Sequence, residues 1–283
     1  MNLCVILFFT KQKRSEEMFP YDYQYSCDGL FFKHELTVSP PCDAFSMHTH
    51  NYCELLYFLS GDATHVIEDR KYKLKKGDLI IIRPSKYHFI QIDSNTDYER
   101  YDILFDEPLI GTSLKAINES VEVINLAQSP TADGIFRRCD YYAKNLPRSA
   151  FSEILPLLIK ELFYNISIEQ SKSTVRDASA VNPILSKALA YINDELFTLK
   201  SVSEVAAKLF VTESYLFRIF KNELHQTPKK YITDKRLLAA QSMIRMGQRP
   251  TDVSEKCGFG DYTTFYRCYK RFFGVSPSEK NAP

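Results

Sequence analysis

Short runs of apolar residues separated by turn residues fill the first part of the chain, as expected of half-buried β-strands. β-branched and aromatic residues dominate these runs, which cover 30–38, 53–59, 64–68, 72–74, 79–82, 88–92 and 101–105. Gly61 and Gly77 lie between neighbouring runs, where a tight hairpin favours a positive φ angle. The pattern predicts a small antiparallel barrel or sandwich and not a series of βαβ units.

The apolar period changes to three and four residues after Pro130, as in amphipathic helices. Segments 135–146 and 152–167 show this period, whereas residues 171–180 are small and polar and have no period. From Asn182 onward, helical segments follow one another with short polar breaks. We therefore expect an α+β multidomain protein: a β-barrel with helices, a linker, and an all-α C-terminal domain.

A helix-turn-helix layout begins at Ser201 with a capping box, in which the Ser201 hydroxyl accepts from the backbone N–H of Glu204 and the Glu204 carboxylate reaches back. After a break at 210–211, Thr212 is placed to cap a second helix that runs to about residue 224. The apolar residues of this second helix share one face. Its outward face carries Ser214, Phe217, Arg218 and Lys221, which can reach base edges and phosphates in a major groove.

The same layout returns further along the chain. Segment 251–257 forms a short helix, Gly258 ends it in a left-handed conformation, and Asp261 caps a helix that runs to residue 273. The polar side of this helix presents Tyr262, Thr263, Tyr266, Arg267 and Lys270. A long helix over 228–246 joins the two units and spans roughly 28 Å, close to the ~34 Å between successive major grooves. We expect both recognition helices to engage one duplex.

Charge and cysteine content narrow the class of protein. Residues 181–283 hold 16 Lys and Arg against 10 Asp and Glu, a net charge of +6 in a chain whose total is +1. A basic module most often meets phosphate or another anionic surface. The seven cysteines form no C-x-x-C pair, which favours a reducing compartment, and the apolar run at 3–9 is too short to cross a bilayer. These features predict a cytoplasmic protein with no membrane contact.

The AraC/XylS family of transcription regulators has a signature that resembles two segments, FVTESYLFRIFK (210–221) and GFGDYTTFYRCYKRFFGVSP (258–277). The resemblance covers about the last hundred residues of the chain. It implies that bases are read by Ser214, Phe217, Arg218, Tyr262, Thr263, Tyr266 and Arg267, with Lys221 and Lys270 on phosphates. Phe217 stands where a small polar residue is usual, so we expect it to pack on a thymine methyl and to alter the target sequence. The resemblance also implies a homodimer, RNA polymerase as a partner, and activation more often than repression.

The cupin superfamily has two signatures that resemble segment 40–92, where His48-Thr49-His50, Glu54 and Gly61 precede Gly77-Asp78, Pro84 and His88. In metal-binding cupins, the positions that match His48, His50, Glu54 and His88 hold Fe, Mn, Ni or Zn. The same residues can instead hydrogen-bond a ligand or stabilise the barrel. We expect the ligand-binding role, with no metal and no cofactor.

The expected effector pocket combines polar groups with flat aromatic faces. The polar groups are His48, His50, Glu54, Arg83 and His88, and the aromatic groups are Tyr52, Tyr57 and Tyr87. This mixture suits a sugar or a sugar derivative. His34, His65 and His225 have no partner at ligand spacing and are discounted.

These observations divide the chain into four parts: a cupin-like effector-binding barrel (19–130), a helical dimerisation region (131–170), a linker (171–180) and a tandem helix-turn-helix domain (181–283). We expect a sequence-specific DNA-binding regulator, not an enzyme, that responds to a small molecule. Two alternatives stay open. A metal-dependent cupin enzyme with a regulatory helical domain would hold metal at full occupancy, and a constitutive architectural binder would ignore metabolites.

Overall fold

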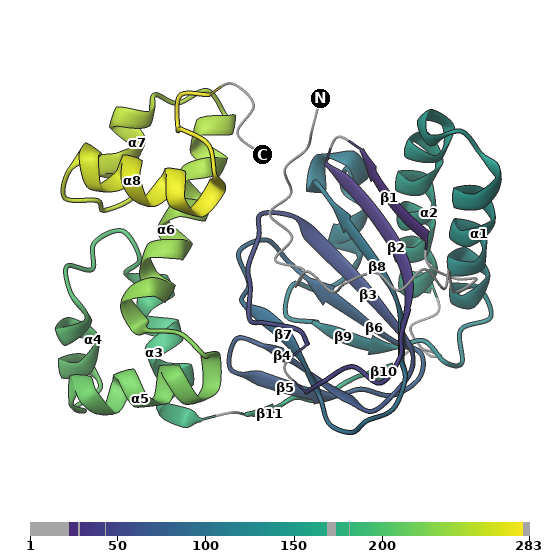
Figure 1. The fold of residues 1–283 in the computed structure, drawn as a ribbon, viewed down its shortest axis with the longest axis horizontal. Coiled ribbons are helices and arrows are strands. Elements are labelled where there is room, and N and C mark those ends of the chain that lie inside the picture. The colour runs from purple at the N-terminus through teal and green to yellow at the C-terminus, as the bar shows by residue number, and fades with distance from the viewer. Residues whose placement is uncertain (1–22, 28, 43, 169–173, 181, 280–283) are drawn as a thin grey trace.

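The computed structural model describes residues 23–27, 29–42, 44–168, 174–180 and 182–279. Figure 1 shows a β-rich N-terminal domain flanked by two helices, beside a helical C-terminal domain. The predicted α+β architecture is therefore confirmed. The apolar run at 3–9 and the expected start of the barrel at 19–22 lie outside the described residues. Within the described ranges, no helix is both long and apolar enough to span a bilayer.

The strands form two sheets, and within the described residues all strand pairings are antiparallel. The strands are Tyr23–Cys27 (β1), Leu30–Thr37 (β2), Cys53–Ser60 (β3), Ala63–Ile67 (β4), Arg70–Lys73 (β5), Asp78–Ile82 (β6), His88–Ile92 (β7), Tyr98–Phe105 (β8), Val123–Asn125 (β9), Thr174–Val175 (β10) and Ser179–Ala180 (β11). One sheet has the order β1-β2-β8-β3-β6-β9-β10, and the other has the order β11-β5-β4-β7. The predicted small antiparallel barrel or sandwich is thus confirmed. The hairpins predicted at Gly61 and Gly77 are not formed, because β3 and β4, and likewise β5 and β6, lie in different sheets and each turn carries the chain from one sheet to the other.

The predicted strands are all present. The structure differs from the prediction in the start of β8 and in three additional short strands, and both differences have simple causes. β8 begins at Tyr98, three residues before the predicted start, because the polar residues Glu99 and Arg100 interrupt the apolar run although both lie in the ladder. β9, β10 and β11 have two or three residues each, too few to show an alternating pattern. Gly77 has φ +84, and a Cβ there would lie 2.8 Å from Ala127 Cα, so the turn before β6 requires glycine.

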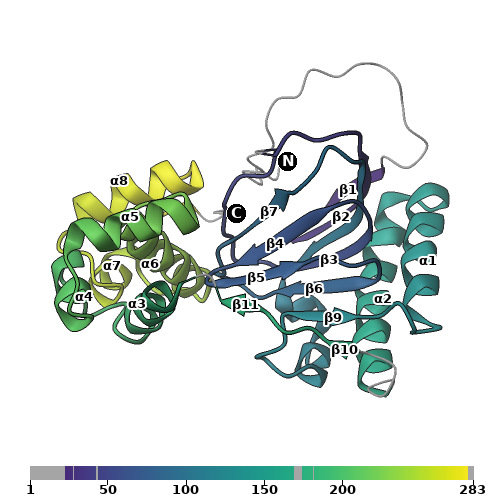
Figure 2. The same ribbon diagram turned by 90° about the horizontal axis from the view of Figure 1, so that it is seen from below.

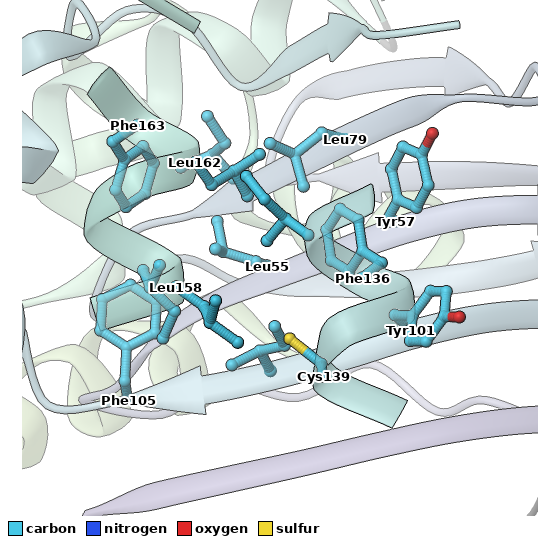
Figure 3. Packing of buried hydrophobic residues seen from close by; sticks show 14 of the residues in the cluster. Leu55, Tyr57, Leu79, Tyr101, Phe105, Phe136, Cys139, Leu158, Leu162 and Phe163 are labelled. Carbon is cyan, nitrogen blue, oxygen red and sulfur yellow. The ribbon is translucent and has the colours of Figure 1, made fainter. Parts of the chain in front are cut away.

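Two helices, Ala132–Asn145 (α1) and Arg148–Ile168 (α2), cover one face of the larger sheet (Figures 1 and 2). Figure 3 shows Leu55, Tyr57 and Tyr101 of this sheet packed against Phe136 and other side chains of the two helices. The rings of Tyr57 and Phe136 stack with centroids 4.3 Å apart. This contact places Tyr57 in the core between sheet and helices, so its expected place in the effector pocket is corrected.

The opposite face of the larger sheet lines the interior of the barrel. Leu56, Phe58 and Tyr98 point there and pack with Ile67 and Ile90 of the smaller sheet in a second apolar cluster. The two faces alternate along each strand, as the pleat requires. Residues 98, 100, 102 and 104 of β8 therefore all face the interior.

The segment between the domains lies along the barrel. β10 pairs with β9 and β11 pairs with β5, although both fall within the predicted linker. Arg176 Nη1 also lies 3.1 Å from the buried carboxylate of Asp78. The described part of this segment is thus held at both sheets, which the absence of a sequence period did not reveal.

The C-terminal domain contains the helices Pro183–Asp194 (α3), Val202–Lys208 (α4), Glu213–Leu224 (α5), Pro228–Arg245 (α6), Pro250–Lys256 (α7) and Tyr262–Phe273 (α8). The predicted caps are confirmed, since the side chains of Ser201, Thr212 and Asp261 accept from the backbone N–H three residues on. Gly258 has φ +73, and a Cβ there would lie 2.4 Å from Phe197 O. Only glycine fits this turn between α7 and α8.

Arg236 on α6 ties the two helix-turn-helix units to each other. Its Nη1 donates to Gly258 O at 2.7 Å, and its Nε donates to Leu196 O at 2.8 Å. The Arg236 guanidinium of α6 therefore connects the segment before α4, in the first unit, to the turn before α8, in the second unit. Figure 2 shows the consequence: α5 and α8 lie on the same face of the domain.

Candidate DNA-binding face and effector pocket

Helix α5 presents the polar face that its sequence predicts. Leu216, Ile219, Phe220 and Leu224 are buried, whereas Ser214, Phe217, Arg218 and Lys221 are exposed. Phe217 is 48% exposed, a large apolar surface for a ring that no neighbouring helix covers. Lys221 Nζ lies 6.0 Å from the centroid of this ring. A cation beside an exposed flat ring suits contact with both phosphate and base.

Helix α8 shows the same division. Phe265, Tyr269 and Phe273 are buried, while Tyr262, Thr263, Arg267 and Lys270 are exposed and Tyr266 is half-buried. The structure thus brings all nine predicted DNA-binding residues to two helices on one face of the domain. Helix α6 has 18 residues and is about 27 Å long, so it separates the two units by roughly the groove spacing of DNA.

A polar cluster of His48, His50, Glu54 and His88 lies at one end of the barrel, with one ligand atom from each residue within 4.8 Å of the others. Backbone pairing creates it, because His48 and His88 exchange N–H···O=C bonds of 3.0 Å in an isolated antiparallel bridge. β3 supplies Glu54. Glu54 Oε2 lies 2.9 Å from His50 Nε2 and 3.0 Å from His88 Nε2.

The backbone fixes which imidazole nitrogens face the carboxylate. The Nδ1 atoms of His48, His50 and His88 bond to the carbonyls of Ser46, Tyr52 and Lys86 at 2.9 to 3.1 Å. These bonds direct each Nε2 away from the backbone, and that of His50 is hydrogen-bonded to Glu54 Oε2. His88 Nε2 is close to Glu54 without hydrogen-bond alignment and has no hydrogen-bond partner within the described residues. Such a nitrogen is oriented to accept a ligand hydrogen or to bind a metal.

The donor set fits a divalent transition metal, since three imidazoles and one carboxylate suit Fe, Mn, Ni or Zn. A metal held by His48, His50, Glu54 and His88 would act as a Lewis acid toward oxygen atoms of a bound molecule. Burial by itself would raise the pKa of Glu54, but His88 and His50 outweigh it and hold the pKa of this carboxyl well below its usual value. Glu54 is thus an anion ready to accept hydrogen bonds or to ligate.

The polar cluster opens into a cavity of about 710 Å³ that both domains line. The barrel contributes the cluster with Phe45, Met47 and Phe89, and the C-terminal domain contributes Leu237 and Leu238 of α6 and Phe272 of α8. A cavity of this size is sufficient for a small organic ligand. Any molecule bound there would touch the helix that joins the two DNA-binding units.

A buried ionic contact closes the two domains around this cavity. Lys235 Nζ and Tyr231 Oη of α6 donate to Glu68 Oε1 at 2.6 and 2.9 Å, and Lys86 Nζ donates to Glu68 Oε2 at 2.9 Å. Glu68 and Lys235 are 4% and 7% exposed. Burial alone would raise the pKa of Glu68, but the two lysines lower it, so the carboxylate stays ionised. Beside this contact, Tyr87 Oη donates to Asp234 Oδ2 at 2.6 Å.

Asn51 connects the polar cluster to α6 directly. It lies between His50 and Tyr52, and its Nδ2 donates to Leu238 O at 2.9 Å and to Gln241 Oε1 at 2.7 Å. Ser85 Oγ donates to Asn51 Oδ1 at 3.0 Å. A displacement of His50 would therefore move a residue that is hydrogen-bonded to the DNA-binding domain.

Four of the five predicted effector residues come together, and the fifth does not. Arg83 does not line the cavity, because its guanidinium donates to Val121 O at 2.9 Å and to Asn118 O at 3.1 Å. The expected role of Arg83 in effector binding is corrected to bracing the loop before β9. Tyr52 and Tyr87 do line the cavity.

Among the cavity residues that the sequence did not predict, three are buried polar residues on barrel strands: His65, Arg100 and Asp102. His65 was discounted because its partners are distant in sequence. Arg100 and Asp102 precede or interrupt the apolar run of β8. A charged residue at every second position of a buried strand was the signal that could have identified them.

Comparison with known proteins relates both domains to one family. A family model described as an AraC-like ligand binding domain matches residues 36–140, and one described as a helix-turn-helix domain matches residues 205–282. The transcriptional activator RhaS of Citrobacter koseri is 24% identical over 247 residues, with 84% of this chain and 88% of RhaS covered. The activator RhaR of Shigella dysenteriae is 23% identical over 249 residues, with the same coverage.

Two solved structures were also matched. ToxT from Vibrio cholerae is 11% identical, with a TM-score of 0.37 over 89% of this chain and 97% of ToxT. An AraC-type regulator from Chromobacterium violaceum is 26% identical, with a TM-score of 0.33 over 35% of this chain and 90% of that chain.

A ligand-binding barrel joined to paired helix-turn-helix units defines a DNA-binding transcription regulator with a small-molecule domain. The two matched ranges together include more than half of the chain, and the chain belongs to the AraC/XylS family.

The first prediction concerns metal binding by the polar cluster. The sequence pointed to a ligand-binding role without metal, but one ligand atom of each cluster residue lies within 4.8 Å of the others. We therefore expect the purified chain to bind one equivalent of Ni²⁺ or Zn²⁺ in calorimetric titration. Glu54→Gln should weaken binding at least tenfold, on the order of the loss seen when a metal site is disturbed. His34→Asn, a histidine outside the cluster, should leave it unchanged. If the wild-type chain binds no metal, the prediction is wrong and the cluster acts only through hydrogen bonds.

Proposed function

We propose that this chain activates transcription in response to a small polyhydroxylated molecule, a sugar, that binds in the barrel cavity. The observation that carries the proposal is the cavity itself, in which the polar cluster faces α6 of the DNA-binding domain. The names of the two relatives, both transcriptional activators, support the sign of regulation and RNA polymerase as a partner. Both matched domains belong to regulators, which favours ligand sensing over enzymatic turnover.

We assign base reading to Ser214, Phe217 and Arg218 of α5 and to Tyr262, Thr263, Tyr266 and Arg267 of α8. Their exposure on one face of the domain supports this assignment. Lys221 and Lys270 lie near the C-terminal ends of the same helices and are assigned to phosphates.

The second prediction separates these two roles. Arg218→Ala and Arg267→Ala should each cost about 1–3 kcal/mol of discrimination at one base pair, because a bidentate contact to guanine is lost. Lys221→Ala and Lys270→Ala should weaken binding evenly and lower the salt slope by about one, because each removes one phosphate contact.

Selection from random DNA fragments, followed by affinity measurement on single-base variants, checks both expectations. Equal weakening on all sequences by the arginine variants would contradict base reading. Recovery of no preferred sequence by the wild-type chain would refute the regulator itself.

A homodimer is proposed through α2. This helix leaves Leu157, Tyr164 and Ile168 exposed at 59%, 50% and 79%, and their spacing places them on one face. Tyr141 of α1 is 63% exposed. Aligned apolar side chains of this size on a helix are typical of an interface between protein chains.

The third prediction tests that face. Leu157→Glu should raise the dissociation constant of the dimer at least tenfold, because a carboxylate would be buried without a partner. Val38→Glu makes a similar change at a side chain that is 50% exposed outside α2, and should leave self-association unchanged. Sedimentation equilibrium measures both. A wild-type monomer at concentrations that saturate the operator would contradict the dimer.

We propose that the effector controls DNA binding through α6. Glu68 and Asn51 of the barrel hold this helix, and the cavity lies between their contacts. A ligand that moves the polar cluster would thus shift the joint between the two recognition units. The signal would not need to pass through α1 and α2.

The fourth prediction concerns this coupling. Glu68→Gln leaves Lys235 buried without its counterion, and breaking such a pair costs about 3–5 kcal/mol. The domains should separate, with a larger radius of gyration in X-ray scattering and a smaller effect of the effector on operator affinity. Lys71→Ala removes the peripheral pair with Glu223, where Lys71 is 36% exposed, and should change neither. An unaltered radius and an unaltered effector response in Glu68→Gln would contradict coupling through α6.

A further inference from the structure

The segment between the barrel and the DNA-binding domain is built into both sheets. Residues 174–180 form a strap, in which β10 pairs with β9 of the larger sheet and β11 pairs with β5 of the smaller sheet. Between these pairings, the backbone N–H of Arg176 donates to Val123 O at 3.0 Å. Figure 2 shows the strap running along the barrel from β10 through β11 toward α3. The strap is therefore bound at several points along its length.

The side chain of Arg176 fixes the middle of the strap. Its Nη1 donates to both carboxylate oxygens of Asp78, at 3.2 and 3.1 Å, and its Nη2 donates to Lys73 O at 3.1 Å. Asp78 is fully buried, and its carboxylate also accepts from the backbone N–H of Lys75 and from Asn125 Nδ2. A buried carboxylate that loses its cation is costly, so the Arg176–Asp78 pair opposes any release of the strap.

Apolar packing contributes little to this attachment. Val175 is 54% exposed, and Ala178 is only partly buried against the apolar cluster inside the barrel. The barrel core thus depends little on the strap, which is held mainly by polar bonds. A segment that served only as a spacer would need no such bonds, since a flexible linker of seven residues already spans roughly 15 Å.

The strap leaves almost no free chain before the DNA-binding domain. Ala180 is paired with Arg70 of β5. Asn182 already caps α3, since its side chain accepts from backbone N–H groups in the first turn of that helix. One residue separates Ala180 from Asn182. Because Glu68 holds α6 at a second point, the docked strap fixes where the DNA-binding domain lies relative to the barrel.

We propose that Arg176 and Asp78 are positioning residues that keep the strap docked, so that a dimer of this chain accepts only one spacing of its two half-sites. The proposal rests on the proposed homodimer and names what sets its operator spacing. Two modules on rigid connections bind two sites together only where the geometry fits, whereas flexible connections tolerate many spacings. A released strap of seven residues would span up to about 23 Å, roughly two thirds of the ~34 Å turn of DNA.

Hydrogen exchange on the full-length chain without DNA tests the docking itself. The wild-type amide of Arg176 should exchange at least about a hundredfold more slowly than in an unstructured peptide, because it is bonded to Val123 O. Arg176→Ala should bring exchange of the strap to within about tenfold of the unstructured rate. An unprotected strap in the wild-type chain would overturn the proposal.

The spacing of two half-sites tests the consequence for DNA binding. The selected half-site is placed twice on one duplex, and the spacing is increased one base pair at a time over a full turn. Wild-type affinity should differ at least about tenfold between the best spacing and one that is half a turn away. In Arg176→Ala the best and worst spacings should differ by less than about threefold, because the released strap can follow either site. An unchanged spacing dependence in this variant would overturn the proposal.

Two further variants separate release of the strap from other effects. Arg176→Ala combined with Asp78→Asn removes both charges, so no buried ion is left without its partner. This double variant should melt cooperatively and show the same loss of spacing preference. Lys73→Ala is the matched control, because it removes a cation that is 54% exposed on β5 but keeps the carbonyl that accepts from Arg176. It should match the wild type in exchange and in spacing dependence.

Binding to a single half-site distinguishes failure of this proposal from failure of the proposed function. The strap variants leave α5 and α8 untouched, so their affinity for one half-site should stay within about twofold of the wild-type value. A wild-type chain that gains no affinity from a second half-site at any spacing refutes the homodimer. A spacing preference that survives release of the strap refutes only the role of Arg176 and Asp78, whereas a chain with no preferred sequence refutes the regulator.

Discussion

The carboxylate of Glu68 is the point at which the two domains depend on each other. It accepts hydrogen bonds from Lys235 and Tyr231 of α6 and from Lys86 of the barrel. Because all of these groups except the Lys86 ammonium are buried, the contact stabilises the domains only while every partner is present. It also keeps the wall of the cavity in place, since α6 lines the cavity from the side opposite the barrel.

The residues around this contact also connect the polar cluster of the barrel to α6 and the DNA-binding units. Tyr87 and His88 are adjacent, as are His50 and Asn51, so segments that carry histidines of the polar cluster also hold α6, through Tyr87–Asp234 and Asn51–Gln241. Arg236 then joins α6 to both helix-turn-helix units. The path from the cavity to the recognition helices therefore needs only a few residues, each held by a hydrogen bond or an ion pair.

Much of the architecture could be predicted from local patterns. The turn glycines, the helix caps at Ser201, Thr212 and Asp261, and the outward faces of α5 and α8 all depend on interactions within a few residues. The polar cluster could also be predicted in part, because the spacing of His48, His50 and Glu54 and the later His88 resembles a known signature. The strands β9, β10 and β11 could not be predicted, because segments of two or three residues are too short to show a hydrophobic period.

Sequence by itself determined the two domains, their secondary structure and the residues exposed on the recognition helices, because periodicity and capping are local properties. Only the tertiary structure decided which polar residues share the cavity. It excluded Arg83 and Tyr57 and brought in His65, Arg100 and Asp102, which depend on strand register across the barrel. It also paired Glu68 with Lys235, a contact between residues 167 positions apart that no local pattern encodes. Burial makes this pair important for stability, because an unpaired charge costs little free energy in water and much more in a buried interface.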